Sequence, residues 1–341
     1  MALVTLIETH GSAPQITGAS ALFSKRGLVI GTLGGGVLER EAQEKAQDCL
    51  KSGFSRVYES RLRGEVYSEE ALCGGRIRVL IDATPVMSIG AFKQLSKSLS
   101  SRQPGVLVAR ILLGSTGRAL IERDWWEHGT RREGLSGGGQ WPRLEEVKQT
   151  LKKGKPKLIN LKKAEGGEKE RRLFFVEPLF PLPRLVIVGA GHVGQALARI
   201  GKLLDFEVTV IDDRNEFANP DRFPEADSLI VGEIGRAVRN FPISSDTYIV
   251  IVTRGHRYDA EALRGCIGSK ASYIGMIGSA RKVALMREEF LARGWATASQ
   301  FDRVHAPIGL KIGSKTVEEI AVSIAAELVL VRSSFGGNQG R

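Results

Sequence analysis

The chain contains the stretch Leu185-Val186-Ile187-Val188-Gly189-Ala190-Gly191-His192-Val193-Gly194, in which four apolar residues run directly into a glycine-rich loop. A short continuous apolar run is typical of a strand buried on both faces of a parallel sheet. The spacing G-x-G-x-x-G predicts a tight turn at Gly189, an open backbone at Gly191 and close helix–strand packing at Gly194. The stretch therefore predicts the first strand, loop and helix of a nucleotide-binding βαβ unit.

The same apolar pattern recurs further along the chain, at Val208–Ile211, Ser228–Val231 and Tyr248–Val252, with helical patterns between the runs. Strands that alternate with helices predict a doubly wound parallel sheet. We therefore expect a Rossmann-like α/β domain over residues 181–335, followed by a flexible tail at 336–341.

Two acids follow the second of these strands. Asp212 is placed to bind a ribose hydroxyl, and Asp213 beside it argues against a 2′-phosphate, so NAD is one candidate ligand of this domain. His192 in the glycine loop is counted among the cofactor-binding residues and is interpreted as a helix-start residue, with catalysis as the alternative.

Two further loops are expected at the same edge of the sheet. Arg254 and His256 follow the fourth strand, and Ser279, Arg281 and Lys282 follow the fifth, with Ser279 as the predicted helix cap. Cations in the first turn of a helix are disfavoured by its dipole, and a bound anion would offset that cost. The loop therefore predicts a phosphate site, with two merely exposed cations as the alternative.

The first part of the chain, residues 1–180, predicts a smaller α+β domain of short strands and glycine-rich turns. Gly34, Gly35 and Gly36 open a helical pattern and could cradle an anion, although Glu39 in the first turn could equally favour the dipole without a ligand. The pattern is weakest over 93–177. Prolines at 178, 181 and 183 then mark a connection between domains.

Three cysteines are present, and only one of them has a loop context. Cys73 is followed by Gly74 and Gly75, which leave its sulfur accessible, so it is the candidate reactive thiol or ligand of a soft metal. The alternative is a small buried hydrophobe, which is also the interpretation of Cys49 and Cys266.

Composition and charge narrow the class of protein. The 341 residues carry a net charge of +11, of which residues 1–183 contribute +9, with 29 basic and 20 acidic side chains. The basic stretch 143–172 has no interleaved aromatic residues, so we interpret it as a solvated, partly mobile linker, not a nucleic-acid site. No apolar run approaches the roughly 20 residues of a spanning helix, and no signal peptide is evident, so we expect a cytoplasmic protein with no membrane partner.

Taken together, these motifs resemble the XdhC/CoxI accessory factors of xanthine dehydrogenase and related molybdenum hydroxylases. The matching segments occur along nearly the whole chain. They are Thr9–Pro14, Gly31–Glu39, Cys73–Gly75, Glu177–Leu179, Gly189–Gly194, Thr253–His256 and His305–Leu310 with the terminal helix.

The resemblance implies a chaperone that binds the molybdenum cofactor and has no catalytic activity of its own. Such factors protect the cofactor while a cysteine desulfurase supplies its terminal sulfido ligand, and they then insert it into the hydroxylase. It implies that the glycine loops with Arg281 and Lys282 could hold the pterin phosphate, and that Cys73 is the candidate molybdenum ligand or a persulfide relay. A homodimer is expected because twofold dimers are the commonest assemblies.

The runner-up function is an NAD-dependent oxidoreductase that uses the G-x-G-x-x-G domain, with His256 or His305 as the acid–base residue. A third class, a nucleic-acid binder, rests on charge alone and is the least favoured.

Overall fold

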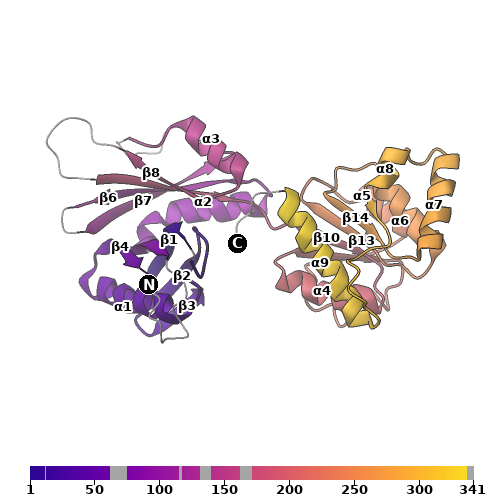
Figure 1. Ribbon diagram of the computed structural model, residues 1–341, viewed down its shortest axis with the longest axis horizontal. Helices are drawn as coiled ribbons and strands as arrows, with labels where there is room; N and C mark the ends of the chain where they lie inside the picture. Colours follow the sequence, from indigo (N-terminus) through magenta and orange to yellow (C-terminus); the bar gives the residue numbers. More distant parts are fainter. Residues whose placement is uncertain (12, 62–74, 115–116, 131–139, 162–170, 336–341) are drawn as a thin grey trace. The chain divides into compact units, whose positions relative to one another are not determined.

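The computed structural model describes residues 1–11, 13–61, 75–114, 117–130, 140–161 and 171–335, and the chain divides into two compact units (Figure 1). The boundary falls between Pro181 and Leu182, within the proline-rich connection. The first unit is the longer of the two, contrary to the expectation of a smaller domain. The predicted tail at 336–341 lies outside the described residues.

The second unit is a parallel six-stranded sheet with the order β12-β11-β10-β13-β14-β15. Its strands are β10 (Arg184–Val188), β11 (Glu207–Asp212), β12 (Ser228–Val231), β13 (Thr247–Ile251), β14 (Tyr273–Met276) and β15 (Val304–His305). Its helices are α4 (His192–Leu203), α5 (Ile234–Asn240), α6 (His256–Cys266), α7 (Ala280–Ala292), α8 (Ala298–Asp302) and α9 (Val317–Phe335). The order is that of a Rossmann fold, which confirms the predicted fold class.

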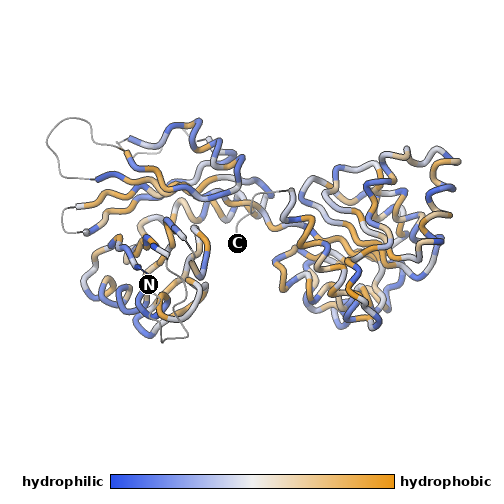
Figure 2. The backbone as a smooth tube through the Cα atoms, viewed as in Figure 1, coloured by the Kyte–Doolittle hydropathy of each residue, from blue (hydrophilic) through white to orange (hydrophobic). Residues whose placement is uncertain are grey.

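Helices cover both faces of this sheet because alternate residues of each strand point to opposite sides. Leu185 and Ile187 of β10 pack with α4 and α9, whereas Val186 and Val188 pack with α5, α6, α7 and α8. The central strands are accordingly mostly hydrophobic, and hydrophilic segments are concentrated in the helices and loops around them (Figure 2).

The first unit is built on a nine-stranded sheet with the order β3-β2-β1-β5-β4-β7-β6-β9-β8. Its strands are β1 (Ala2–His10), β2 (Ser20–Ser24), β3 (Gly27–Gly31), β4 (Ser55–Arg61), β5 (Arg76–Asp82), β6 (Gly105–Leu113), β7 (Arg118–Glu127), β8 (Lys157–Leu161) and β9 (Arg171–Leu179). The helices are α1 (Gly36–Ser52), the 3-10 turn η1 (Pro85–Ser88), α2 (Ile89–Ser100) and α3 (Leu144–Lys153). All strand pairs in it are antiparallel.

This sheet curls, so that its two ends share a core. Ile7 of β1 and Leu80 of β5 belong to one apolar cluster with Ile111 of β6 and Phe175 of β9, and β1 contacts β8 directly. Helix α3 packs on the other face of β6 and β9, through Val147, and α1 covers β1, β2 and β5. The curl brings loops from both ends of the sheet together.

The interpretation of residues 143–172 as a linker is wrong for the part that is described. Helix α3 begins within it and buries Val147 and Thr150, and β8 adds a strand to the sheet. Its lysines lie on the solvent side of a short amphipathic helix, so charge density concealed the apolar stripe. Within the described ranges, no helix combines the length and the apolar character needed to cross a bilayer.

Candidate functional site

The glycine loop of the second unit has the geometry that its spacing predicts. A Cβ at Gly189, where φ is +122°, would lie 2.4 Å from the carbonyl oxygen of Val252, and a Cβ at Gly194 would lie 2.1 Å from that of Gly189. A Cβ at Gly191 would meet nothing within 4 Å. The first and third glycines are therefore required by packing, whereas the second leaves the start of α4 open to a ligand.

Asp212, at the end of β11, contacts this loop and is 2% exposed. Its carboxylate accepts a hydrogen bond from the Ala190 amide at 2.7 Å and from the Arg214 amide and guanidinium at 2.8–3.0 Å. Burial acts to raise the pKa of Asp212, but these hydrogen bonds outweigh it and the pKa is lowered. Asp212 therefore organises the glycine loop. Its carboxylate is already hydrogen-bonded, whereas the sequence predicted that it would be available to a ribose hydroxyl.

Asp213, the next residue in the chain, also has a hydrogen-bond partner. Asp213 accepts a bidentate pair of hydrogen bonds from Arg254 at 2.6 and 2.7 Å, and the Arg254 guanidinium lies 4.1 Å from the ring centre of Tyr258. His256 is exposed at the start of α6, with its Nε2 3.7 Å from Glu289, and His192 is exposed at the start of α4. His192 also lines a cavity of about 560 Å³ between α4 and the start of α9. The loops that the sequence grouped do meet at one edge of the sheet.

The predicted phosphate site is divided by the structure. Ser279 caps α7, as predicted, by accepting a hydrogen bond from the Lys282 amide. The Lys282 ammonium forms an ion pair with Asp259, which is fully buried and also accepts from the Thr253 hydroxyl at 2.6 Å. Lys282 therefore neutralises a buried acid. Arg281 is exposed and makes no ion pair with a described residue, so of the two predicted cations it is the one whose charge is not already paired.

In the first unit, Gly34, Gly35 and Gly36 all have positive φ and lead into α1. A Cβ at Gly34 would lie 2.8 Å from that of Pro14, so this position requires glycine, whereas Gly35 and Gly36 face open space. Glu39 bends back and accepts hydrogen bonds from the Thr32 hydroxyl and the Leu33 amide at 2.9 and 3.0 Å. Glu39 therefore holds the loop in place, and the start of α1 has no side-chain cap.

A cavity of about 790 Å³ opens beside this loop. Its walls come from the β1–β2 connection (15–20), the residues after β3 (31–32), the α3–β8 turn (154–156) and the end of β9 (177–179). Lys155 and Glu177 are the charged residues among the described lining. Burial raises the pKa of Glu177 to about 7, and the charge of Arg123 opposes the shift. A carboxyl group that titrates near neutrality within a cavity is a mark of a functional site.

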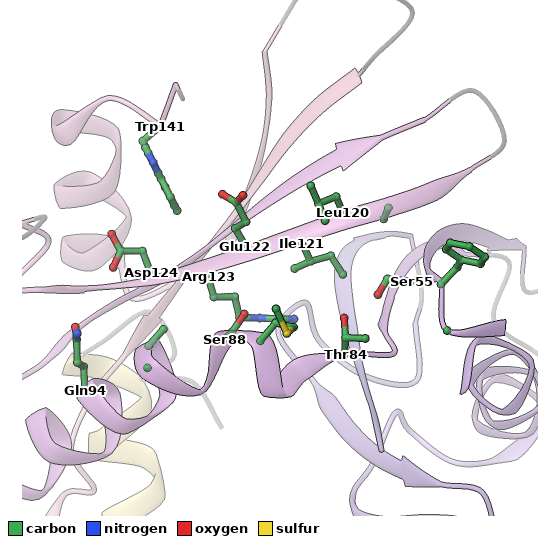
Figure 3. A pocket seen from close by; sticks show the side chains of 16 residues that line it. Ser55, Thr84, Ser88, Gln94, Leu120, Ile121, Glu122, Arg123, Asp124 and Trp141 are labelled. Atoms are coloured by element: carbon green, nitrogen blue, oxygen red, sulfur yellow. The ribbon is translucent and has the colours of Figure 1, made fainter. Parts of the chain in front are cut away.

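A second cavity of about 560 Å³ lies between β7 and α2 (Figure 3). Figure 3 shows Arg123 directed toward η1 and α2, whereas Glu122 and Asp124 point to the side of Trp141. Arg123 is 3% exposed and forms an ion pair with Asp82, which is 2% exposed. Arg123, which lines this cavity, is already paired with Asp82 and is therefore not available to a ligand.

The candidate thiol, Cys73, and its neighbour Gly74 lie outside the described residues. Gly75 is buried and leads into β5, whose first residue pairs with His10 at the end of β1. The other two cysteines, Cys49 and Cys266, are buried, as expected of structural residues. In the described ranges no three His, Cys, Asp or Glu side chains gather as a metal site.

Comparison with known families assigns the chain to one family. Residues 185–328 match the profile described as the XdhC Rossmann domain, and residues 1–60 match that of the XdhC and CoxI family. The chain belongs to this family. The resemblance drawn from the motifs is thereby confirmed.

Relatives of the XdhC and CoxI chain include three curated proteins. Uncharacterized protein YqeB of Escherichia coli is 35% identical over 60% of this chain, a match that spans 39% of YqeB itself. A probable xanthine dehydrogenase subunit of Bacillus subtilis is 27% identical over 97% of this chain and 92% of its own length. The molybdenum cofactor insertion chaperone PaoD of Escherichia coli is 22% identical over 97% of this chain and 83% of its own.

A solved structure covers both domains of this XdhC-type chain. A crystal structure described as a xanthine dehydrogenase from Bacillus halodurans matches with a TM-score of 0.77 and 26% identity, over 98% of this chain and 91% of that one. The two-domain architecture is therefore shared with a solved relative along nearly the whole chain.

Two of the family motifs meet at the larger cavity of the first domain. The segments Gly31–Glu39 and Glu177–Leu179 are 138 positions apart at their nearest ends, yet both supply its lining. Sequence reasoning matched Glu177 to the family without assigning it a role, and it missed Lys155 inside the basic stretch. The available signal was an acid at the end of an otherwise apolar strand, Leu173–Val176, just before a proline.

Proposed function

We propose that this chain binds the molybdenum cofactor as cargo in the cavity of its first domain. The observation that carries the proposal is the convergence of the segments at 31–32 and 177–179 on one space of about 790 Å³, large enough for a pterin-sized ligand. That space is lined by an acid, a cation and glycine-rich backbone, which suit a ligand with a polar ring and a phosphate.

The names of the relatives give the biological setting. One is called a molybdenum cofactor insertion chaperone, and another is called a probable subunit of xanthine dehydrogenase. We infer that this chain holds the cofactor for a xanthine dehydrogenase-type hydroxylase while a cysteine desulfurase supplies the sulfido ligand, and that it then inserts the cofactor. A homodimer in the cytoplasm and a Cys73 thiolate on molybdenum belong to the same proposal.

A second candidate is the binding of NAD by the Rossmann domain. The strand order and the open backbone at Gly191 favour it, because a pyrophosphate could approach the start of α4. The hydrogen bonds of Asp212 disfavour it, because the ribose would have to displace Arg214 and Ala190 from that carboxylate. An NAD-dependent oxidoreductase is therefore the less favoured function.

Equilibrium binding of released molybdenum cofactor to the purified chain, with NAD titrated in parallel, separates the two functions. We expect nearly stoichiometric pterin and molybdenum with little NAD. Cys73→Ser should lower molybdenum retention without unfolding the protein, and equal retention would remove the thiolate from the proposal. Tight NAD binding without pterin would favour the oxidoreductase instead.

A further inference from the structure

Glu177 is the one charged residue in the second part of β9, Leu173–Leu179. In the sheet it lies opposite Leu107 of β6, which in turn lies opposite Trp125 of β7, so all three share one face. Leu107 and Trp125 form an apolar cluster with α2. A carboxylate on this face loses its hydration unless a ligand or a polar group replaces the water.

Neighbouring loops enclose the Glu177 carboxyl group closely. A Cβ at Gly18, where φ is +98°, would lie 3.5 Å from its Oε1 and 3.0 Å from Cγ of Pro156. Glycine at this position therefore lets the β1–β2 connection approach the carboxylate while the cavity stays open beside it.

No described residue donates a hydrogen bond to Glu177 or forms an ion pair with it, and burial raises its pKa to about 7. The nearest opposing charge is that of Arg123, whose guanidinium is already paired with Asp82. Glu177 is partly exposed and lines the cavity, so its carboxylate is an acceptor that a ligand in the cavity can reach.

The residues around Glu177 indicate which hydrogen-bond donors suit its carboxylate. Ile16, Pro178 and Leu179 give the cavity apolar walls that can flank a flat ring. Lys155 adds a positive charge to the lining, which disfavours a purely cationic ligand and favours one with an anionic group. A neutral ring with an N–H beside an amino group would satisfy both carboxylate oxygens at once and leave its phosphate for the lysine.

We propose that Glu177 is the ring-recognition residue of the cavity and accepts two hydrogen bonds from the 2-amino-4-oxopyrimidine edge of a pterin. This inference rests on the proposed function, since it assigns that cargo an orientation. It places the ring between the β1–β2 connection and the end of β9, and the phosphate of the ligand toward Lys155.

The test uses two probes that differ only at the recognised edge, pterin and pteridin-4-one, which lacks the 2-amino group. Binding to the full-length chain is measured by fluorescence titration at pH 7.5. We expect pterin to bind at least about tenfold more tightly than pteridin-4-one, because one charge-assisted hydrogen bond separates them. Glu177→Gln and Glu177→Ala should abolish that preference. Glu44→Gln, an exposed position in the middle of α1, is the matched control and should keep it.

The outcomes separate this inference from the proposed function. Equal binding of the two probes by the native chain, binding of neither, or a preference that survives both Glu177 substitutions would overturn the role of Glu177. If the native chain also retains released molybdenum cofactor in any of those cases, the proposed function stands and only the orientation is lost. The native chain could instead prefer pterin in a way that depends on Glu177 and yet retain no molybdenum cofactor. That result would support recognition of the pterin edge by Glu177 and would reject the molybdenum cofactor as the cargo.

Discussion

Glu177→Gln should stabilise the first domain, and the gain should grow with pH. The native carboxyl group has a pKa raised by burial from 4.5 to about 7, so the folded domain binds a proton more tightly than the unfolded chain does. The contribution of this tighter proton binding to the unfolding free energy is fully present below pH 4.5 and is lost as the pH rises through 7. Glutamine keeps the shape and carries no charge at any pH, so it avoids that loss.

The magnitude follows from the shift. The difference between 4.5 and about 7, at about 1.4 kcal/mol per pKa unit, corresponds to about 3 kcal/mol of unfolding free energy above pH 8. Most of this change in unfolding free energy develops between pH 5 and pH 8. With a urea dependence of about 2 kcal/mol/M, the variant's midpoint should lie about 1 to 1.5 M above the native one at pH 8.

Urea unfolding followed by tryptophan fluorescence measures this directly. Trp125, Trp126 and Trp141 lie in the first unit and Trp295 in the second, so a Trp295→Phe background restricts the signal to the first. Glu44→Gln serves as the control, with a midpoint that follows the native chain at both pH values. A Glu177→Gln difference that is equal at pH 5 and pH 8, or a destabilisation at pH 8, would refute the reasoning.

Three further predictions concern the other residues of the two domains. Lys282→Met should lower the unfolding free energy by about 3 kcal/mol, because it leaves the Asp259 carboxylate buried and unpaired. Arg281→Ala should change the unfolding free energy by less than about 0.5 kcal/mol. Equal shifts of the melting temperature in the two variants would contradict the assignment of the buried ion pair to Lys282. Gly194→Ala should lower the unfolding free energy by about 2 kcal/mol or more, because its Cβ would clash with a carbonyl oxygen. Gly191→Ala should fold normally, and thermal melting compares the two variants. A native-like melting temperature for Gly194→Ala would contradict the packing argument. Lys155→Ala should weaken binding of a phosphorylated pterin several-fold at low salt and leave unphosphorylated pterin unaffected; an equal loss for both would remove the lysine from phosphate binding.

The second domain could be predicted well from sequence because its signals are local. The run Leu185–Val188 and the glycines after it specify strand, turn and helix within ten residues, and the spacing alone predicted which glycine stays open. The partners of individual side chains could not be predicted in the same way. Asp212 was interpreted as a ribose ligand and Lys282 as a phosphate ligand, and in the structure each already interacts with a residue of this chain. Such pairings depend on rotamers and distances that sequence spacing does not encode.

The first domain was harder because its sheet is assembled from distant segments. The order of strands places β9 between β6 and β8, and β1 contacts β8, so the cavity joins loops near residues 15, 31, 155 and 177. Helix α3 was missed because five of its ten residues are charged, and its apolar stripe is short. The role proposed for Glu177 emerges only once the curled sheet brings Gly18 close to it and Lys155 into the same cavity.

The most direct test of the central claim is hydrogen–deuterium exchange of the full-length chain with and without bound molybdenum cofactor. Exchange reports local opening segment by segment, so it identifies the domain that closes on the ligand. We predict protection at 15–20, 154–156 and 177–179, with no change at 189–194 or 253–257. Protection confined to the loops around Gly191 and Arg254 would contradict the account and assign the cargo to the Rossmann domain.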